Sequence, residues 1–277
     1  MCIRDSLSVT QIDQLIRNPY AVYARSILKL RVLEQIDAPI TAAHSGSVVH
    51  ALFDRLVCDH PETLPDDVAA AIRGYAENPE HFMHGQKEVV DYWRARLAAA
   101  ADWLAEFEAA RDDVVARHSE LTGAMTWEIA GSPFTLTARA DRIDRHRGGR
   151  FTIIDYKTGT LPSRKRVEDG YFLQLPLEAA ILAAGGFEGL PEGRIAELLY
   201  VRLTGGTPAG EQRAVSDPPA RAREAKETVA RLIARYRDPA TPYRAHLRPH
   251  LIAYDDPYDH LARRAEWSNV ADTGDAS

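Results

Sequence analysis

Residues 138–160 of the 277-residue chain read ARADRIDRHRGGRFTIIDYKTGT, and this stretch decides the fold. Apolar and polar side chains alternate from Phe134 to Asp141, which is the period of a strand with two unlike faces. The Gly-Gly pair in the middle predicts a hairpin turn, and residues 151–157 predict a second strand. We therefore expect two paired antiparallel strands, the first of which ends at Asp141.

The charged residues of this hairpin suggest a chemical use. Asp155 and Lys157 are two positions apart, so their side chains point to the same side of a strand, and the pairing brings Asp141 towards them. Two carboxylates can hold a Mg²⁺ that polarises a phosphoryl oxygen and acidifies a bound water, while a lysine stabilises the charge that develops on the phosphate. The pattern favours phosphodiester hydrolysis. A solvated surface pair has the same D-x-K form, so the rest of the chain must decide.

The composition is that of an ordinary soluble globular protein, with 45% hydrophobic and 27% charged residues. A net charge of −6 excludes a global basic field, so contact with DNA must come from local clusters. Two clusters are candidates, although both are also typical of solvated faces. They are Arg142, Arg145, Arg147 and Arg150, and Arg164, Lys165 and Arg166.

Cysteine usage and hydropathy limit the environment of the chain. Cys2 and Cys58 are the only cysteines, so no disulfide framework is implied, and by themselves they are too few for an iron-sulfur cluster. The sequence has no apolar run of transmembrane length and no secretory signal. We expect no membrane partner and a cytoplasmic location.

Helices precede the sheet in the predicted order of elements. One helix begins behind a capping box at Ser8, a second follows Pro19, and a third, amphipathic helix carries His50. A long helix is predicted over residues 87–117. Further on we expect a strand over residues 124–129, the central hairpin, a helix over 167–184, a buried strand over 196–203, a turn over 205–210 and a helix over 218–237. This order predicts an α/β or α+β core.

Four motifs in this order resemble those of the PD-(D/E)xK nuclease superfamily, in particular the RecB-like nuclease domain. They are a G-x-x-x-H helix at residues 46–50, a G-x-x-D-R-I-D strand at 138–144 with alanine in place of the glycine, D-Y-K-T-G at 155–159, and a helix that begins near Gln174. Residues 8–23 and 258–268 are similar to the ends of the C-terminal nuclease domain in the AddB family of alphaproteobacterial type. That family supplies the partner subunit of AddA helicase-nucleases.

The resemblance implies a fold and a set of functional residues. The fold would be a restriction-endonuclease-like core, in which a mixed central sheet is flanked by helices, with an N-terminal helical section. Lys157 would assist the attacking water, and Gln174 would support the site or contact the DNA. The metal, Mg²⁺ with Mn²⁺ as a substitute, would be held by His50, Asp141, Asp155 and the backbone carbonyl of Tyr156.

The resemblance also implies a division of the chain. Residues 7–268 would form one RecB-like nuclease domain. Its helical insertion would cover about residues 59–117, and its catalytic core about 41–58 and 120–204. Residues 1–6 (MCIRDS) match nothing that follows and are expected to be a non-native leader, and residues 269–277 a flexible tail.

The implied activity is hydrolysis of single-stranded DNA, as an exonuclease, after an AddA-type helicase-nuclease subunit has unwound it for double-strand break repair by homologous recombination. One alternative is a catalytically silent nuclease-like domain that binds DNA or braces the AddA subunit. Another makes the D-Y-K hairpin a coincidence in some other hydrolase, and it requires His50 to lie far from Asp141 and Asp155. The intact set of four motif residues favours the nuclease.

Two positions depart from the family pattern. Glu178 stands where the Q-x-x-x-Y motif has its tyrosine, so the role of this position is open. Asn18 stands where many AddB proteins have the first cysteine of an iron-sulfur cluster, and the end of the chain has no cysteine. We therefore expect no iron-sulfur cluster.

Overall fold

The computed structural model describes residues 5–32, 42–77, 87–157, 159–204, 206–245, 256–263 and 266, and for residues 42–49, 87–90, 92 and 93 it describes the backbone alone. Residues 1–4 of the expected leader and the expected tail of residues 269–277 lie outside this part. Ser6, which was also assigned to the leader, belongs to a strand and pairs with Thr135.

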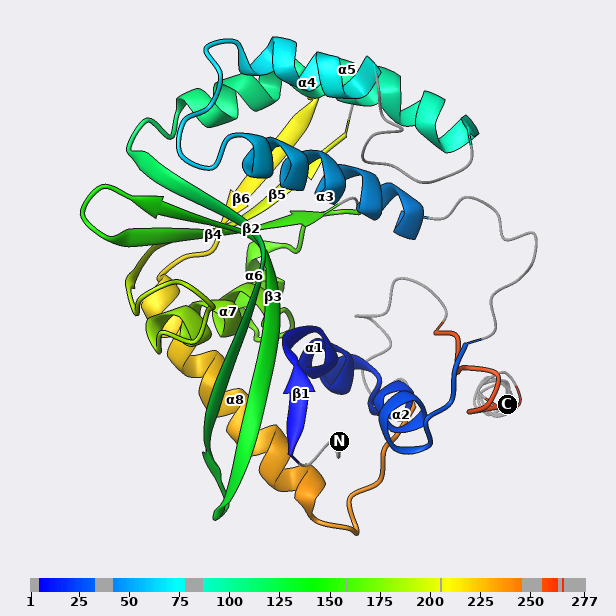
Figure 1. Ribbon diagram of the computed structural model, residues 1–277. Coiled ribbons are helices and arrows are strands. Elements are labelled where there is room, and N and C mark those ends of the chain that lie inside the picture. The colour runs from blue at the N-terminus through cyan, green and yellow to red at the C-terminus, as the bar shows by residue number, and fades with distance from the viewer. Residues whose placement is uncertain are drawn as a thin grey trace.

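A mixed sheet of six strands forms the centre of the described structure (Figure 1). Its order is β1-β3-β4-β5-β6, and β2 also pairs with β3. The β1–β3 and β4–β5 pairs are parallel, whereas β2–β3, β3–β4 and β5–β6 are antiparallel. The strands are β1 (Ser6–Ser8), β2 (Val114–Ile129), β3 (Ser132–His146), β4 (Arg150–Lys157), β5 (Arg194–Leu203) and β6 (Gly210–Ala214).

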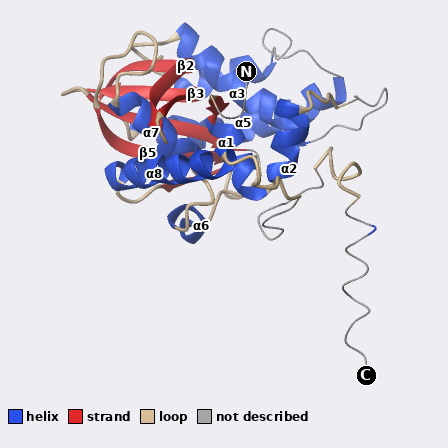
Figure 2. Cartoon of the chain, turned by 90° about the horizontal axis from the view of Figure 1, so that it is seen from below, coloured by secondary structure: helices blue, strands red, loops and turns tan. Residues whose placement is uncertain are grey.

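Helices cover both faces of this sheet (Figures 1 and 2). One face carries α3 (Ala42–Asp59), α4 (Val68–Glu77) and α5 (Lys87–Ala109). The other carries α1 (Val9–Arg17), α7 (Gln174–Ala183) and α8 (Pro218–Arg237). The remaining short helices are α2 (Pro19–Val22), the π-helix η1 (Tyr23–Ile27) and α6 (Arg164–Glu168). None of the helices in the described ranges combines the length and the apolar character that crossing a membrane requires.

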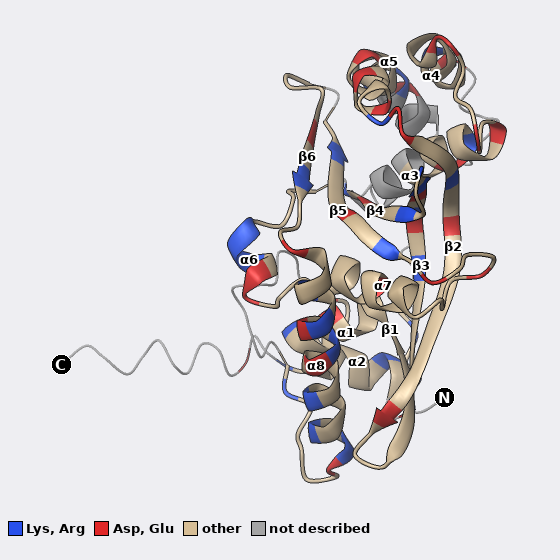
Figure 3. Ribbon diagram, turned by 90° about the vertical axis from the view of Figure 1, so that its left-hand side faces the viewer, with Lys and Arg blue, Asp and Glu red and all other residues tan. Residues whose placement is uncertain are grey.

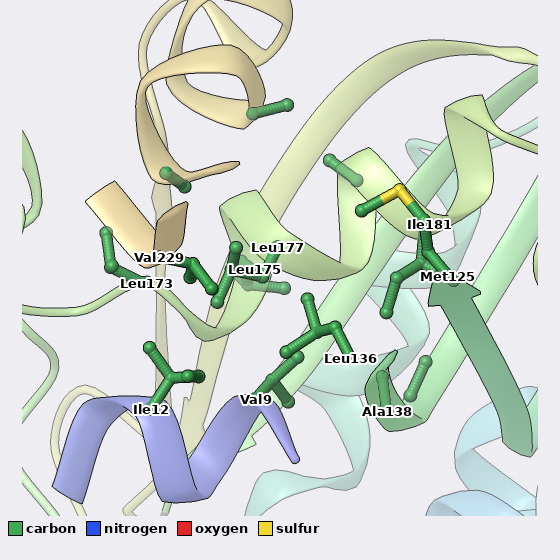
Figure 4. Close-up of a cluster of buried hydrophobic side chains, with 14 of the residues drawn as sticks. Val9, Ile12, Met125, Leu136, Ala138, Leu173, Leu175, Leu177, Ile181 and Val229 are labelled. Atoms are coloured by element: carbon green, nitrogen blue, oxygen red, sulfur yellow. The ribbon is translucent and has the colours of Figure 1, made fainter. Parts of the chain in front are cut away.

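The two helical layers bury two separate hydrophobic clusters. In β4, Ile153 belongs to the cluster under α1, α7 and α8, and the next residue, Ile154, belongs to the cluster under α3, α4 and α5. This alternation is the period of two along a strand that is buried on both faces. Figure 4 shows the first cluster, in which Ile12 of α1 lies beside Leu173 and Leu175 at the start of α7. The sheet with helices on both faces confirms the predicted α/β class and the restriction-endonuclease-like core.

Local sequence signals account for the elements that were predicted well. The Ser8 Oγ accepts a hydrogen bond from the Gln11 N–H at 3.2 Å, and the Gln11 side chain accepts one from the Ser8 N–H at 2.8 Å, so the capping box is present. Gly148 and Gly149 both have positive φ angles (85° and 73°), which the tight turn between β3 and β4 requires.

Other predicted boundaries are wrong, in each case because sheet pairing or a turn intervenes. The long helix ends at Ala109 rather than at residue 117, since β2 begins at Val114 and pairs with β3 along its length. For the same reason β3 does not end at Asp141 but continues to His146. The helix predicted over residues 167–184 is broken at Gly170, whose φ of 73° is left-handed, so α7 begins only at Gln174.

The strand β6 was not predicted. Its sequence, GEQRA at residues 210–214, is polar and follows a turn, so it carries no strand pattern. It becomes a strand because it pairs with β5, with Gly210 opposite Leu203.

Candidate metal centre

Asp141 lies where the pairing of β3 and β4 ends. The last backbone pair is Arg142 opposite Ile154. Beyond it the Asp141 Oδ2 accepts a hydrogen bond from the Tyr156 backbone N–H at 2.8 Å, so a side chain replaces the backbone acceptor of the ladder. This contact holds the Asp141 carboxylate against the end of β4, as the predicted hairpin requires.

His50 of α3 reaches the same point from the helical layer above. Its Nε2 lies 3.1 Å from the backbone oxygen of Tyr156. A carbonyl oxygen can only accept a hydrogen bond, so Nε2 is the protonated ring nitrogen. Its Nδ1 lies 3.4 Å from the Asp141 Oδ1, which contradicts the alternative that placed His50 far from Asp141. In the neutral ring the lone pair on Nδ1 therefore faces a carboxylate.

Glu120 of β2 completes this group, and it was not predicted from the sequence. Its neighbours Ser119 and Leu121 pair with Arg142 and Ala140, so Glu120 lies across from Asp141. Its Oε1 is 3.8 Å from the His50 Nδ1, and its φ of 52° is left-handed. A lone glutamate in a polar segment gives no local signal, so only the register of β2 on β3 identifies it.

His50, Glu120 and Asp141 each offer one donor atom, and these atoms lie within 4.8 Å of one another. One imidazole nitrogen and two carboxylate oxygens are a donor set that suits a divalent transition metal, and carboxylates also suit Mg²⁺. Glu120 is also bound by the exposed Arg139, whose Nε lies 2.7 Å from Glu120 Oε2. The donor chemistry of these residues fits a divalent cation.

Asp155 is brought close to this group but is engaged with Lys157. The Lys157 Nζ lies 2.9 Å from one Asp155 oxygen and 2.7 Å from the other, and Asp155 is buried. Asp155 is not one of the three residues whose donor atoms cluster within 4.8 Å, so its predicted ligand role stays a prediction. The same holds for the Tyr156 carbonyl, which here accepts the hydrogen bond of His50.

Burial and neighbouring charges shift the pKa values of the site. Burial, reinforced by the Asp155 charge, raises the pKa of Asp141 to about 7. Burial acts to lower the pKa of Lys157, but the Asp155 carboxylate and its hydrogen bond outweigh it and raise that pKa above its usual value. Lys157 is therefore a cation at neutral pH, which suits it to stabilise negative charge rather than to remove a proton.

Gln174 and Glu178 extend the site into α7. The Gln174 Oε1 accepts a hydrogen bond from the Lys157 Nζ at 3.2 Å, and the Gln174 Nε2 donates one to the Glu178 Oε1 at 3.2 Å. Glu178 is fully buried, and burial together with the charges of Asp155 and Asp141 raises its pKa well above the usual range. Gln174 therefore forms a hydrogen bond with Lys157.

One candidate for contact with DNA is wrong. Arg142 is fully buried and binds the carboxylates of Asp144 and Glu108, with Nε 2.6 Å from the Asp144 Oδ1. Burial of an arginine is tolerated only with such partners, and it removes Arg142 from any nucleic-acid surface. Arg164, Lys165 and Arg166 are exposed on α6 (Figure 3).

Comparisons with known proteins show which family the chain is similar to. The family model of the PD-(D/E)XK nuclease superfamily matches residues 6–247. An uncharacterized protein of Rickettsia bellii (strain RML369-C) is 30% identical over 182 residues, which are 65% of this chain and 22% of that protein. One from Rickettsia felis (strain ATCC VR-1525 / URRWXCal2) is 30% identical over 213 residues, which are 73% of this chain and 24% of that protein.

The region matched in these relatives is therefore less than a quarter of their length. Among solved structures, the crystal structure of SSO0001 is similar with a TM-score of 0.40 and 15% identity, over 81% of this chain and 75% of that chain. Since the family model covers most of the chain, this protein belongs to the PD-(D/E)XK nuclease superfamily.

Proposed function

We propose that this chain is a metal-dependent deoxyribonuclease that hydrolyses phosphodiester bonds of single-stranded DNA. The observation that carries the proposal is the meeting of His50, Glu120 and Asp141 within 4.8 Å, beside the Asp155–Lys157 pair. Membership of a nuclease superfamily supports phosphodiester hydrolysis as the reaction, and this cluster supports the binding of a divalent metal ion.

The protein residues have separate roles in this reaction. A divalent ion, Mg²⁺ or in its place Mn²⁺, supplies polarisation of the phosphoryl oxygen and a more acidic water when it is bound. The hydrogen bond from Nε2 to the Tyr156 oxygen orients the His50 ring so that Nδ1 faces the carboxylates. Asp155 and Gln174 take two of the three N–H groups of Lys157, and the third donates to the attacking water or to the phosphoryl oxygen on which negative charge develops.

The exposed cations of α6 support a path for the DNA. The run Arg164, Lys165 and Arg166 lies in the chain between the end of β4, which carries Lys157, and the start of α7, which carries Gln174. With a net charge of −6, the chain has no general attraction for nucleic acid, so phosphate contacts would need a local cationic run of this kind.

We further infer that the nuclease acts as an exonuclease on strands unwound by an AddA-type helicase-nuclease subunit, during double-strand break repair by homologous recombination in the cytoplasm. The support is the similarity of residues 8–23 and 258–268 to the AddB family. Co-purification of the full-length protein with an AddA-type subunit, and loss of that association when residues 258–268 are deleted, would test this partnership.

The nuclease itself is tested by cleavage of end-labelled single-stranded DNA with Mg²⁺ or Mn²⁺ and with an EDTA control. We expect Lys157→Ala and Asp141→Asn to reduce the rate on the order of a hundredfold or more, because each removes stabilisation of the reacting phosphate. Lys226→Ala, a lysine on α8, serves as the matched control. A wild-type chain that binds DNA but never cuts it, even with an AddA-type subunit supplied, would favour the silent DNA-binding or bracing domain.

A further inference from the structure

Lys157 has two acceptors on different elements. Its Nζ donates to the Asp155 Oδ1 on its own strand at 2.9 Å and to the Gln174 Oε1 on α7 at 3.2 Å. About one third of the lysine side chain is exposed (32%), so without the second acceptor little besides Asp155 would restrain the ammonium. The position of the Lys157 ammonium therefore depends on how Gln174 is held.

The orientation of the Gln174 amide follows from its two partners. The ammonium of Lys157 can only donate, so the amide oxygen must face it. The amide nitrogen then points to the Glu178 Oε1, 3.2 Å away, which accepts its hydrogen. Rotation of the Gln174 amide by half a turn would place its NH₂ group against the Lys157 ammonium. It would also place the amide oxygen against the Glu178 Oε1.

Glu178 is itself held in place. It lies one turn along α7 from Gln174, the spacing at which helical side chains meet, and none of its surface is exposed. The start of α7 is fixed from outside as well, because the buried Asp13 of α1 accepts a hydrogen bond from the Leu173 backbone N–H at 2.8 Å. The helix therefore presents Glu178 as a rigid acceptor.

We propose that Glu178 is a positioning residue, which fixes the amide of Gln174 and through it the ammonium of Lys157. Its role in cleavage rests on the proposed nuclease function, whereas its effect on Lys157 does not. Loss of Glu178 frees the Gln174 amide to rotate, and Lys157 is then left with Asp155 alone.

The test compares Glu178→Ala, Gln174→Ala and the double variant with two controls. Glu178→Gln keeps a carbonyl oxygen for the Gln174 amide. Leu182→Ala removes a buried side chain one further turn along α7 without touching the hydrogen bonds. The first measurement is the NMR order parameter of the Lys157 Cε methylene, which needs no nuclease activity.

We expect this order parameter to fall equally in Glu178→Ala, Gln174→Ala and the double variant, and to stay at the wild-type value in Glu178→Gln and Leu182→Ala. In cleavage assays kcat should fall on the order of tenfold in the same three variants, with KM nearly unchanged, since the lysine is displaced rather than removed. An order parameter that falls as much in Leu182→Ala as in Glu178→Ala, or that Glu178→Ala leaves unchanged, would overturn the proposal. If the wild type does not cut DNA, only the proposed function fails, and the order parameters still decide the role of Glu178.

Discussion

At the scale of single residues, Glu120 combines a left-handed backbone conformation with a side chain that is a candidate metal ligand. A residue other than glycine with a φ of 52° costs on the order of 1 kcal/mol or more and persists only where its surroundings impose it. Here Arg139 binds one carboxylate oxygen, and His50 lies near the other. The left-handed backbone directs the Glu120 side chain towards His50 and Asp141.

The substitution Glu120→Gln keeps the size of the side chain and removes its charge. We expect the Kd for Mn²⁺, measured by calorimetry in the absence of DNA, to rise on the order of tenfold. Glu128→Gln, on an exposed part of the same strand, is the matched control. Equal Mn²⁺ affinity in the two variants would exclude Glu120 from the metal site.

The raised pKa of Asp141 predicts a pH dependence of cleavage. With its pKa at about 7, Asp141 is protonated in much of the metal-free protein at pH 6, and a protonated carboxyl is a poor metal ligand. Activity at low metal concentration should therefore rise as the pH increases through about 7. Because the ion binds the deprotonated form, the pH of the half-rise should move down as the metal concentration increases. A half-rise that is independent of metal concentration would contradict this assignment.

At the scale of elements, buried carboxylates connect helices to their neighbours. Asp13 of α1 binds the start of α7 through the Leu173 N–H, and it is almost fully buried (4% exposed). Burial raises its pKa to about 6, although Arg17 and the Leu173 N–H act in the opposite direction. The charged form of Asp13 is thus less stable in the folded chain than in the unfolded chain.

The raised pKa of Asp13 determines how its contribution to stability changes with pH. Between about pH 4 and pH 6 the folded state keeps a proton that the unfolded state has lost, so this contribution to stability decreases as the pH rises through that window. Asp13→Asn keeps an oxygen for the Leu173 N–H and removes the charge. We expect it to raise the free energy of unfolding at pH 7.5 by about 1–3 kcal/mol, and by less at pH 4.5. Urea unfolding at both pH values measures this, and a gain of the same size at both would show that charge is not the cause.

The Arg142 network connects α5 to the sheet. Arg142 of β3 binds Glu108 of α5 and Asp144, all buried. Arg142→Met leaves two buried carboxylates without their main partner, so we expect a loss of about 3–5 kcal/mol in the free energy of unfolding. Arg145→Met, at an exposed position of the same strand, should change it by less than about 0.5 kcal/mol. A similar effect of both substitutions in urea unfolding would show that the network contributes little.

At the scale of the whole molecule, a net charge of −6 means that the proposed binding of DNA would depend on a few local cations. Each contact with a single-strand phosphate contributes about 0.7 to the slope of log affinity against log salt concentration. Replacing Arg164, Lys165 and Arg166 by alanine should therefore reduce that slope by about 2. Fluorescence anisotropy with the Lys157→Ala chain measures binding without cleavage.

The matched comparison for this experiment is the other exposed basic cluster. Replacing Arg145, Arg147 and Arg150 by alanine removes the same number of charges at the β3–β4 turn. A reduced slope for this set and not for α6 would move the DNA path to that turn. An unchanged slope for both sets would show that neither run contacts phosphates.

The sequence by itself determined the features whose signals are local. The alternation along β3 and the Gly-Gly turn predicted the hairpin, and the spacing of Asp155 and Lys157 placed both on one side of β4, where they form an ion pair. The capping box at Ser8 was confirmed in the same way. These features depend on neighbours a few residues apart, so a short window of sequence contains their physical cause.

Only the tertiary structure decided which distant residues meet. The register of β2 on β3 ended the long helix early and brought Glu120 to Asp141, and the packing of α5 turned Arg142 from a candidate surface cation into a buried one. The packing of α7 against the sheet brought Gln174 to Lys157. Strand register and helix docking are set by partners far along the chain, so no local pattern specifies them.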